Sequence, residues 1–435
     1  MKKNLIKVTI ILSMLLLTVI PLSVNAMSGN GTEESPFLIT TEEELLLVTD
    51  FPDCHFKLAN DIVMSEAIKT PICYESENGT FLGVFDGNGH TISNVGFGYD
   101  ISKISLFNKN QGVIKNLNVE GLRLSMNGLT VSGIVDENLG NIINCTVKDV
   151  SGIESAYGIA RLNSGTISEC TVSGIIWGQG DNAGISYENS GIIEKCTVTA
   201  AVVAEWGSIT GICYQNKSKI ENCCFLGDLS NVNAADDHVN TVAGVSVYNG
   251  GWNGVDGNIK NCLVVATFNN ATNIYPIACN YSNSNSTMEN CYYDKTVSGL
   301  STTTYGTPKS TSAMKMIQTY QTNWDFDTVW GIDSNINNGY PYLLWEYAPT
   351  DNQITFDTET QKAKIYLKEA GTYTVIFADY DGTIFKEANI QPLTLKQGYN
   401  SIPTTLTLTN GDKVFLWKDL KTLVPICEVL EISSK

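Results

Sequence analysis

Three tryptophans are the side chains in this sequence best suited to stacking against a ligand. Each follows one copy of a repeated phrase and lies near a glycine: Trp177, Trp206 and Trp252. An indole has a large apolar face and a polar N–H edge, so it can pack on the C–H face of a sugar ring. A row of indoles would form a platform for carbohydrate. The competing interpretation, favoured by their unequal spacing in the repeat, is that these rings pack onto the body of the protein.

Carboxylate chemistry has weaker support. Glycoside hydrolysis needs two acids that flank one bond, and a repeated fold could present them at one outward position. Acids near the cysteines of the repeat are Glu169, Glu194, Glu221 and Glu289. Glu194 and Glu221 share a position, but Lys260 occupies it in a later copy. Arg161, a candidate base for elimination, has no obvious acidic neighbour. We expect no catalytic residues, and a polysaccharide-active lyase or hydrolase is the alternative.

Metal and cofactor sites are not predicted. The histidines are scattered at His55, His90 and His238, and no HExxH motif of a zinc protease is present. His90 follows the turn sequence Asp86–Gly89, which favours a structural role. No CxxC pair of a zinc site occurs. Asp379 and Asp381 in ADYDG fit a hairpin turn better than a calcium site.

An internal repeat supplies the elements that carry these residues. Its clearest copies are Gly133–Val147, Gly158–Val172, Gly184–Val198 and Gly211–Phe225. They follow the pattern G-[IV]-x-x-x-N-x-G-x-I-x-x-C-x-V, with the cysteine 12 residues after the leading glycine and a period of 25 to 28 residues. Such a period is typical of a solenoid, in which each copy is one layer of scaffold.

Within each phrase apolar and polar residues alternate and β-branched side chains are common, which is the period of a strand. We predict one strand per layer, paired in register with the next layer about 4.8 Å away. Crossover connections between parallel strands are almost always right-handed. The predicted fold class is therefore all-β: a right-handed parallel β-helix (solenoid) with short helical caps, followed by a small C-terminal β-sandwich.

Two columns of identical residues are expected to hold the layers together. The first is an amide ladder of Asn110, Asn138, Asn163, Asn189, Asn216 and Asn249. Stacked amides can hydrogen-bond from layer to layer. The second column contains Cys145, Cys170, Cys196, Cys223 and Cys262, with Leu117 in the first copy. Interior packing is favoured over a ligand-binding ladder for both columns.

The chain has 12 cysteines, which in a secreted protein invites disulfides. Cysteines stacked on parallel strands would hold their Cβ atoms about 4.8 Å apart, whereas a disulfide prefers about 3.8 Å. We therefore expect buried free thiols in the column. Cys54 and Cys73 lie outside it, and their redox state stays open.

Residues 1–26 fit a secretory signal peptide, with three lysines, a 13-residue apolar run and small residues before the cleavage position. No second apolar run follows, so no transmembrane segment is expected after its removal. The net charge is −18 and becomes −21 without those lysines. Such acidity disfavours nucleic acid and anionic membranes. We expect a secreted, extracellular protein, free or associated with the cell surface.

Five segments are predicted: the signal peptide at 1–26, an N-terminal cap and first coils at 27–104, the repeats at 105–300, a C-terminal cap at 301–348 and the sandwich at 349–435. Thr41 and Glu44 form a capping box that predicts a short helix over the first layer. A second short helix is predicted within Ser310–Tyr320. Such caps cover strand edges that would otherwise template aggregation.

The last segment alternates apolar and polar residues over short runs. These runs are Lys362–Leu367, Thr372–Phe377, Gly382–Ile390 and Lys413–Leu416. Glycine-containing turns separate them. About 85 residues of this pattern predict a sandwich of immunoglobulin or fibronectin type.

Residues 31–345 resemble the GLUG-motif proteins, secreted β-helical proteins of bacteria. The resemblance rests on TEESPFLITTEEELL, FKLANDIVMS, FDGNGHTISNV, the repeated phrase, and WDFDTVWGI with NNGYPYL. Of the family's Gly-Leu-x-Gly motif, only the leading Gly-aliphatic pair is retained, as at Gly133-Ile134. The C-terminal segment is similar to small sandwiches appended to extracellular proteins of clostridia-like bacteria. The resemblance implies an extracellular location and contact with carbohydrate or an adhesion partner, and it supplies no catalytic residues.

These observations favour an extracellular, non-catalytic binding or adhesion protein whose partner is a glycan or a surface protein. The alternatives are a polysaccharide-active β-helix enzyme and a structural spacer that displays the sandwich. The sequence predicts no cofactor and no nucleic-acid partner.

Overall fold

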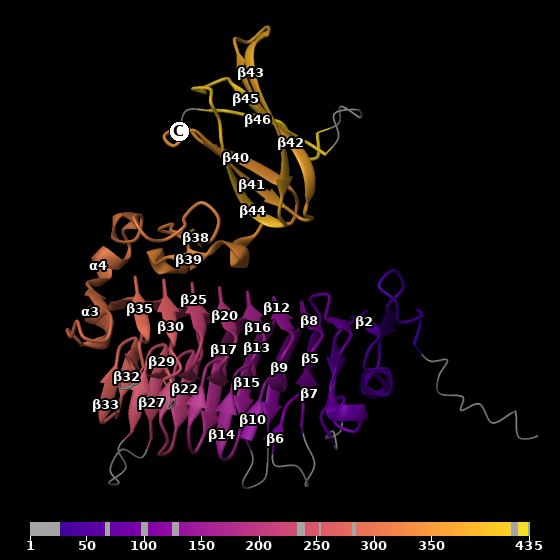
Figure 1. The fold of residues 1–435 in the computed structure, drawn as a ribbon, viewed down its shortest axis with the longest axis vertical. Helices are drawn as coiled ribbons and strands as arrows, with labels where there is room; N and C mark the ends of the chain where they lie inside the picture. Colours follow the sequence, from indigo (N-terminus) through magenta and orange to yellow (C-terminus); the bar gives the residue numbers. More distant parts are fainter. Residues whose placement is uncertain are drawn as a thin grey trace, which may run out of the picture. The chain divides into compact units, whose positions relative to one another are not determined.

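The predicted fold class is confirmed. In the computed structural model the chain is all-β, with a parallel β-solenoid of about eight turns and small antiparallel sheets at the C-terminus (Figure 1). The described residues are 27–65, 70–96, 103–123, 130–232, 240–251, 254–280, 284–418 and 425–433. The predicted signal peptide and Trp252 lie outside them.

Each complete turn contains four or five short strands, so the prediction of one strand per layer is wrong. In one turn these are β10 (Thr130–Ser132), β11 (Val135–Asn138), β12 (Asn141–Ile143) and β13 (Thr146–Ser151). The repeated phrase spans the last three of them. Strand alternation breaks at Asn144, which has a φ of 51°. That left-handed residue turns the chain through a corner, so Ile142, Cys145 and Val147 all face inward and are buried.

The chain divides into two compact units, one formed by residues up to 192 with 200–208, the other by 193–199 with 209–435. The first unit contains strands of four parallel sheets. The first sheet contains β1 (Phe37–Ile39), β2 (His55–Leu58), β4 (Val84–Asp86), β8 (Val113–Lys115), β12 and β16 (Thr166–Ser168), and the second contains β6 (Lys103–Ile104), β10, β14 (Ser155–Tyr157) and β18 (Asn182–Ala183). The third contains β7 (Phe107–Asn110), β11, β15 (Ala160–Asn163) and β19 (Ser186–Asn189), and the fourth contains β3 (Ile62–Val63), β5 (Thr91–Ser93), β9 (Asn118–Arg123), β13, β17 (Thr171–Gly178) and β22 (Ala201–Ala204). Strand β20 (Ile192–Glu194) lies at the boundary.

The same succession of strands recurs in the second unit. The strands that correspond to the first sheet are β25 (Lys219–Glu221), β30 (Asn258–Lys260) and β35 (Thr287–Glu289), and those that correspond to the second are β23 (Ile209–Thr210), β28 (Thr241–Ala243) and β33 (Asn273–Tyr275). Those that correspond to the third are β24 (Cys213–Asn216), β29 (Ser246–Asn249) and β34 (Ala278–Asn280). Those that correspond to the fourth are β21 (Thr197–Val198), β26 (Cys224–Phe225), β31 (Leu263–Val264), β36 (Tyr292–Asp294) and β37 (Thr307–Lys309), together with β27 (Asp228–Asn231) and β32 (Thr267–Asn269).

A short helix lies near the start of the first unit, α2 (Glu42–Leu46), followed by a 3-10 turn, η1 (Leu47–Asp50). The Thr41 hydroxyl accepts a hydrogen bond from Glu44 N–H at 3.2 Å, as in a capping box. The Glu44 carboxylate reaches back to Thr40 N–H at 2.6 Å. A second 3-10 turn, η2 (Glu77–Gly79), lies farther along.

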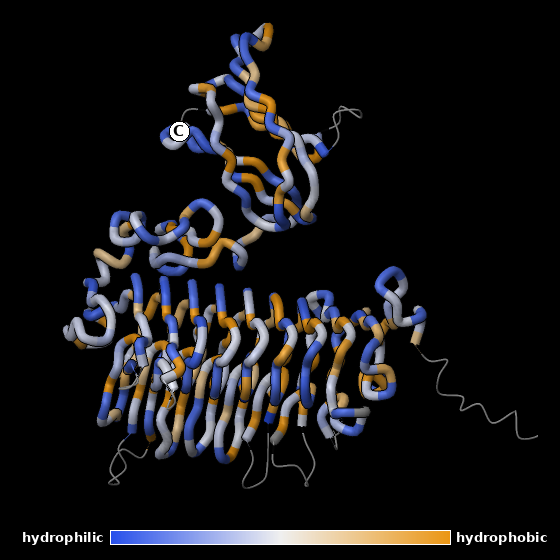
Figure 2. Tube along the Cα trace, in the orientation of Figure 1, coloured by the Kyte–Doolittle hydropathy of each residue, from blue (hydrophilic) through white to orange (hydrophobic). Residues whose placement is uncertain are grey.

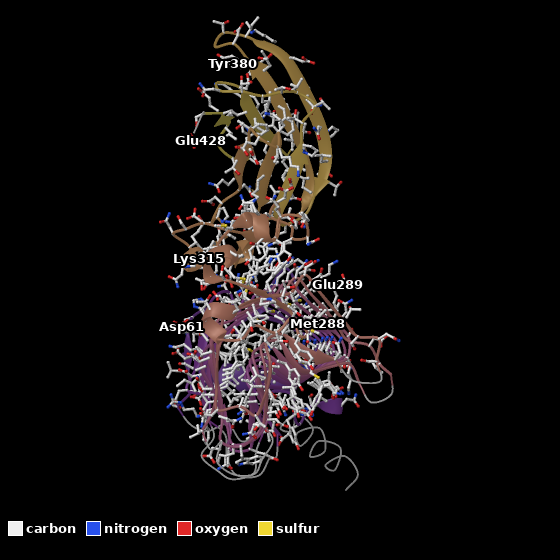
Figure 3. All side chains as sticks on the ribbon, turned by 90° about the vertical axis from the view of Figure 1, so that its left-hand side faces the viewer. Asp61, Met288, Glu289, Lys315, Tyr380 and Glu428 are labelled. Carbon is white, nitrogen blue, oxygen red and sulfur yellow. The ribbon has the colours of Figure 1, made fainter. Side chains whose placement is uncertain are left out.

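The second unit has a cap of short elements after its last solenoid strands. They are α3 (Lys295–Ser298), α4 (Thr311–Met314), η3 (Ile317–Thr319), β38 (Trp330–Gly331), η4 (Asn337–Gly339), β39 (Tyr342–Leu343) and η5 (Leu344–Tyr347). The helix predicted within Ser310–Tyr320 is thus a single turn followed by a 3-10 turn. Trp324 and Trp330 stack at 4.2 Å in its core. Lys315, labelled in Figure 3, places Nζ 4.9 Å from the centroid of the Tyr340 ring.

The C-terminal part is a two-sheet antiparallel sandwich. One sheet is β40 (Gln353–Asp357), β41 (Lys362–Leu367) and β44 (Gly398–Pro403); the other is β43 (Phe385–Leu395), β42 (Gly371–Tyr380), β45 (Lys413–Trp417) and β46 (Leu430–Glu431). The four runs predicted from the sequence correspond to β41, β42, β43 and β45. Hydrophobic residues follow these strands in Figure 2, and their inward side chains form a core of their own.

Candidate functional site

Two of the three predicted binding tryptophans lie on neighbouring turns, Trp177 in β17 and Trp206 in the loop after β22. Strand β17 pairs with β22, which sets Ile175 opposite Ala201 and Trp177 opposite Val203. The alternate residues Ile176 and Val202 are buried. Ile175 is 51% exposed and Trp206 is 45% exposed. We call this surface the tryptophan patch; it consists of Ile175, Trp177, Ala201, Val203 and Trp206.

Tight backbone packing positions Trp206. Its N–H donates to Gln179 O at 2.9 Å, two residues beyond Trp177 on the preceding turn. The next residue, Gly207, lies so close to that turn that a Cβ would stand 2.0 Å from Gly180 C. Because only glycine fits there, the loop lies directly against the preceding turn. The edge of the partly exposed indole lies over Gly180, where a Cβ would stand 3.3 Å from Trp206 Cη2.

A buried amide fixes the loops beside the patch. Asn182 Oδ1 accepts from Ala156 N–H at 2.7 Å, and its Nδ2 donates to Gly178 O at 2.9 Å and to Val203 O at 2.8 Å. One side chain thus joins three strands of two successive turns, β14, β17 and β22. Nothing in the sequence marked Asn182, because it falls outside the repeated phrase.

The asparagine column forms a hydrogen-bonded ladder within each unit. Each Nδ2 donates to the Oδ1 of the next asparagine: Asn110 to Asn138 at 2.9 Å, Asn138 to Asn163 at 2.8 Å, Asn163 to Asn189 at 2.8 Å, Asn216 to Asn249 at 2.9 Å and Asn249 to Asn280 at 2.9 Å. Asn280 was missed from the sequence because its copy of the phrase is too diverged. Apart from Asn280 the ladder is buried, so it is scaffold and offers no surface for a ligand.

The cysteine column is likewise interior. All twelve cysteines are free thiols, and Cys145, Cys170, Cys196, Cys223 and Cys262 are buried. Cys170 Sγ lies 3.2 Å from Ser168 O and Cys145 Sγ lies 3.4 Å from Ile143 O, so each thiol can donate to a backbone carbonyl at the corner. Burial raises the pKa of the Cys145 and Cys262 thiols well above the ordinary value. Such thiols are poor nucleophiles.

Several outward acids are paired with lysine or arginine. Arg161, expected to have no acidic neighbour, is bound by Asp136 through Nε at 2.6 Å and Nη2 at 2.9 Å. That expectation was wrong because Asp136 lies one turn earlier. Lys219 contacts both Glu194, at 3.9 Å, and Glu221. Carboxylates neutralised in this way are poorly placed to act as an acid–base pair.

His90 has a structural partner. Its Nδ1 lies 3.2 Å from Asp61 Oδ1, which also accepts Thr91 N–H at 2.9 Å. These hydrogen bonds, first from Thr91 and then from His90, lower the pKa of Asp61. The pair therefore joins the residues that directly precede β3 and β5, which are paired strands of neighbouring turns.

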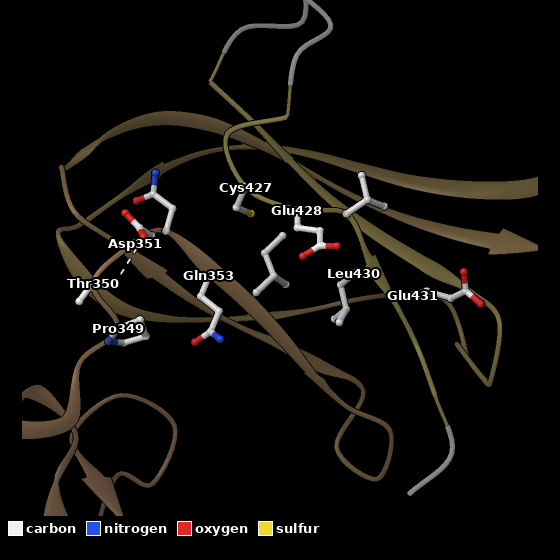
Figure 4. Close-up of a pocket in the computed structure, with 11 residues that line it drawn as sticks. Pro349, Thr350, Asp351, Gln353, Cys427, Glu428, Leu430 and Glu431 are labelled. Atoms are coloured by element: carbon white, nitrogen blue, oxygen red, sulfur yellow. Dashed lines mark hydrogen bonds between the residues drawn. The ribbon is translucent and has the colours of Figure 1, made fainter.

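Two hollows formed by described residues differ in the charge of their lining: the first carries only acidic groups, and the second carries groups of both signs. One of about 610 Å³ lies between the edge strands of the sandwich, lined by Asp351, Gln353, Cys427, Glu428 and Leu430 among others (Figure 4). Asp351 is paired with Lys368 at 3.8 Å. A second, of about 300 Å³, is lined by residues that include His55, Lys57 and Asp86.

Across the described ranges, no cluster of three or more His, Cys, Asp or Glu side chains is arranged to hold a metal ion. Nor is any helix in that part of the chain long and apolar enough to cross a membrane.

Comparison with known proteins gives limited likenesses. No protein-family model matches the chain. A stretch of 60 residues is 45% identical to a Gly-rich membrane protein of Evansella cellulosilytica, which is 14% of this chain and 7% of that protein. The chain thus spans less than a tenth of that relative's length.

Two solved structures have similar parts. An IgA1 protease matches 59% of this chain and 21% of its own, with a TM-score of 0.44 and 16% identity. The L. reuteri 53608 SRRP matches 58% of this chain and 98% of its own, with a TM-score of 0.23 and 15% identity.

Proposed function

We propose that this chain is an extracellular, non-catalytic binding or adhesion protein and that the tryptophan patch of its solenoid contacts carbohydrate. The observation that carries the proposal is the pair of tryptophans on neighbouring turns, Trp177 in β17 and the 45% exposed Trp206 after β22, with Ile175 half exposed on β17. A contiguous exposed apolar patch often marks a contact site, whereas single exposed apolar residues do not. Indoles are suited to the C–H faces of sugars.

The rest of the solenoid supports binding rather than catalysis. The interior columns are buried and the Arg161–Asp136 and Lys219–Glu221 pairs neutralise outward charges. The extracellular location rests on the signal-peptide pattern of residues 1–26 and on the motifs that resemble GLUG proteins.

The test is a glycan array probed with residues 27–435 and with the double variant Trp177→Ala/Trp206→Ala. We expect retention on one glycan class and at least a tenfold loss in the variant, because aromatic anchors dominate such contacts. Tyr74→Ala is the matched control, since Tyr74 is 46% exposed outside the patch. Circular dichroism must show that every variant keeps its β-structure.

Other results of the glycan array would change the proposed function. Unchanged retention by the folded double variant would remove the patch from the binding surface. A blank array would favour a protein partner or a spacer role. New reducing ends or unsaturated products from the retained glycan would replace the binding function with an enzymatic one.

A further inference from the structure

One strand of the sandwich is buried on both faces. In β42 the residues Tyr373, Val375 and Phe377 point into the core. The alternate residues Ile376 and Ala378 lie on the opposite face of the sheet, yet they are only 9% and 2% exposed. The outer face of a two-sheet sandwich is ordinarily solvated and polar. Neighbouring apolar side chains therefore cover the outer face of this sheet.

The strand register identifies these neighbours. Ile376 of β42 lies opposite Phe415 of β45 and Ile390 of β43. The outward residues Thr374 and Ala378 of β42 lie opposite residues of the same two strands. We call this surface the outer strip; it consists of Trp417, Thr374 and Pro392, then Phe415, Ile376 and Ile390, then Lys413, Ala378 and Ala388, and finally Tyr380 with Phe385.

Four aromatic rings run along the strip in contact with one another. The ring centroids are 5.1 Å apart for Tyr380 and Phe385, 5.7 Å for Phe385 and Phe415, and 5.9 Å for Phe415 and Trp417. Their planes are tilted by 43°, 72° and 53° in the same order. Phe385 is 53% exposed and Ile390 is 55% exposed. Tyr380, labelled in Figure 3, lies near the tip of the hairpin.

The strip carries no unpaired charge. Its one ionisable group apart from the Tyr380 phenol, the Lys413 ammonium, lies 3.3 Å from Glu431 and 4.7 Å from the centroid of the Tyr380 ring. Residues 349–435 contain nine lysines and eleven acids, a net charge of −2 in a chain of −18. The negative net charge would repel an anionic ligand, and the strip has no unpaired cation that could bind one. A neutral ligand meets no such barrier.

The strip is narrow. Three strands spaced by about 4.8 Å and seven residues along β42 at about 3.4 Å each give roughly 14 Å by 24 Å. That footprint, on the order of 300 Å², is well below the ~800 Å² that each partner buries in a stable protein complex. A second copy of the chain or a globular partner would be held weakly. A long, thin ligand fits the shape.

Polar groups border the apolar rings. Strand β43 is the edge strand of its sheet, so the backbone groups that point away from β42 can bond to hydroxyls. Rings that stack on C–H faces beside backbone groups that bond to hydroxyls match the two kinds of surface on a sugar chain.

From these features we propose that the outer strip of the sandwich binds a single chain of a neutral polysaccharide. The tilts between successive rings suit a twisted, soluble chain rather than the flat surface of a crystalline polymer. This site lies in the second unit and does not rest on the tryptophan patch.

The test is affinity electrophoresis of residues 27–435 in gels that contain hydroxyethylcellulose, mixed-linkage β-glucan, xylan or the acidic polymer polygalacturonate. We expect retardation by at least one neutral polymer and about a tenfold weaker interaction for Phe385→Ser/Ile390→Ser. Phe385→Tyr should keep the ring and the binding, which guards against an effect of misfolding. Val63→Ser/Leu82→Ser is the control, because these residues are 67% and 52% exposed elsewhere.

Four results would overturn the proposal: no retardation by any neutral polymer, retardation by polygalacturonate alone, equal retardation of Phe385→Ser/Ile390→Ser, or a dimer in sedimentation that this variant abolishes. The last result would assign the strip to a second copy. Trp177→Ala/Trp206→Ala should bind these neutral polymers as the parent chain does. Loss of retardation in the tryptophan variant, with full retardation of Phe385→Ser/Ile390→Ser, would assign polymer binding to the tryptophan patch and overturn the strip proposal.

Discussion

Buried asparagines give this solenoid a polar spine inside an apolar core. A buried amide costs free energy unless its donors and acceptors are paired. Each ladder amide meets this need by bonding to the layers on either side, and Asn110 Oδ1 and Asn189 Oδ1 also accept a backbone N–H two residues on, from Gly112 and Gly191. The ladder therefore fixes the register between layers, because a slipped layer would leave amides unpaired.

Replacing one rung should be costly. Asn138→Leu would leave Asn110 Nδ2 and Asn163 Oδ1 without their partner at the centre of the first unit. We expect a loss of about 3 kcal/mol in the free energy of unfolding, measured by urea denaturation. Asn141→Ala is the control, because Asn141 is exposed on the same turn and should change stability by less than about 0.5 kcal/mol. Equal losses in the two variants would contradict the ladder's role.

Asp294 organises the cap of the second unit. Its carboxylate accepts from Thr311 Oγ1 and Tyr340 OH, both at 2.7 Å, and from two N–H groups of α3. Burial alone would raise the pKa of Asp294, but these hydrogen bonds lower it overall. Because the folded pKa lies below the unfolded one, the stabilisation is present above about pH 4 and is lost as the pH falls through the folded pKa.

Asp294→Asn should therefore destabilise the protein in a pH-dependent way. We expect a loss of about 1–3 kcal/mol at pH 7 that shrinks below about pH 4. Faster hydrogen exchange at Thr296 and Val297 would locate the effect in the cap. Asp333→Asn, on an exposed turn, should show neither change. A difference that stays constant between pH 7 and pH 3 would count against the charged hydrogen bonds.

Single residues were predictable where the repeat aligned them. The ladder and cysteine columns recur at a fixed spacing, so their positions followed from the sequence. Arg161 and Asp136 are separated by 25 residues, one period of the repeat, and stacking of successive copies could have found this pair. Trp206 in its loop could be suspected, but its presentation depends on Gly207 and the turn beneath, which the phrase does not include.

At the scale of elements, corners decide the cross-section of the solenoid. One corner of each turn is a residue with positive φ that precedes the cysteine column: Asn116, Asn144, Glu169, Lys195, Asn222, Asn261 and Asn290. Asparagine tolerates this conformation better than other residues with a side chain. Asn144 Nδ2 also donates to Asn116 Oδ1 at 2.8 Å, which adds a second, outer ladder.

Glu169, with a φ of 53°, departs from this rule. Glu169→Asn should relieve backbone strain and raise the free energy of unfolding by about 1 kcal/mol, measured by thermal and urea denaturation. Ser168→Asn, in the adjacent extended strand β16, is the matched control and should give no gain. A loss of stability in Glu169→Asn would mean that contacts of the Glu169 side chain outweigh the strain.

These corners explain why the number of strands in each turn differs from the prediction of one. Alternation read across Ile142–Val147 looked like one strand, whereas a left-handed Asn144 lets residues three apart face inward together. Strands of three residues are too short to carry a periodic signal, so corner residues are the better guide to this fold. In the sandwich the runs are longer, and Lys362–Leu367 coincides with β41.

For the whole molecule, the separate cores suggest where the chain can be divided. The sandwich has its own core of residues between Ile354 and Ile432. The cap core contains Trp324 and Trp330 together with Leu263 and Tyr292 of the last solenoid strands. The apolar outer strip was not predicted, because alternation of apolar and polar residues indicates only one buried face of a strand. Ile376, Ile390 and Phe415 already marked the second face.

Division after residue 348 should therefore give two folded pieces, 27–348 and 349–435, each with a cooperative thermal transition. Division after residue 300 should not. A 27–300 fragment lacks Trp324 and Trp330, which exposes Leu263 and Tyr292 and leaves the last strands uncovered, so we expect aggregation in size-exclusion chromatography. An unfolded 349–435 fragment would show instead that the bond from Lys362 Nζ to Asp327 at 2.6 Å, and its neighbours, are required for the sandwich. The cap and the sandwich would then form one folding unit, and the outer strip could be studied only in the full chain.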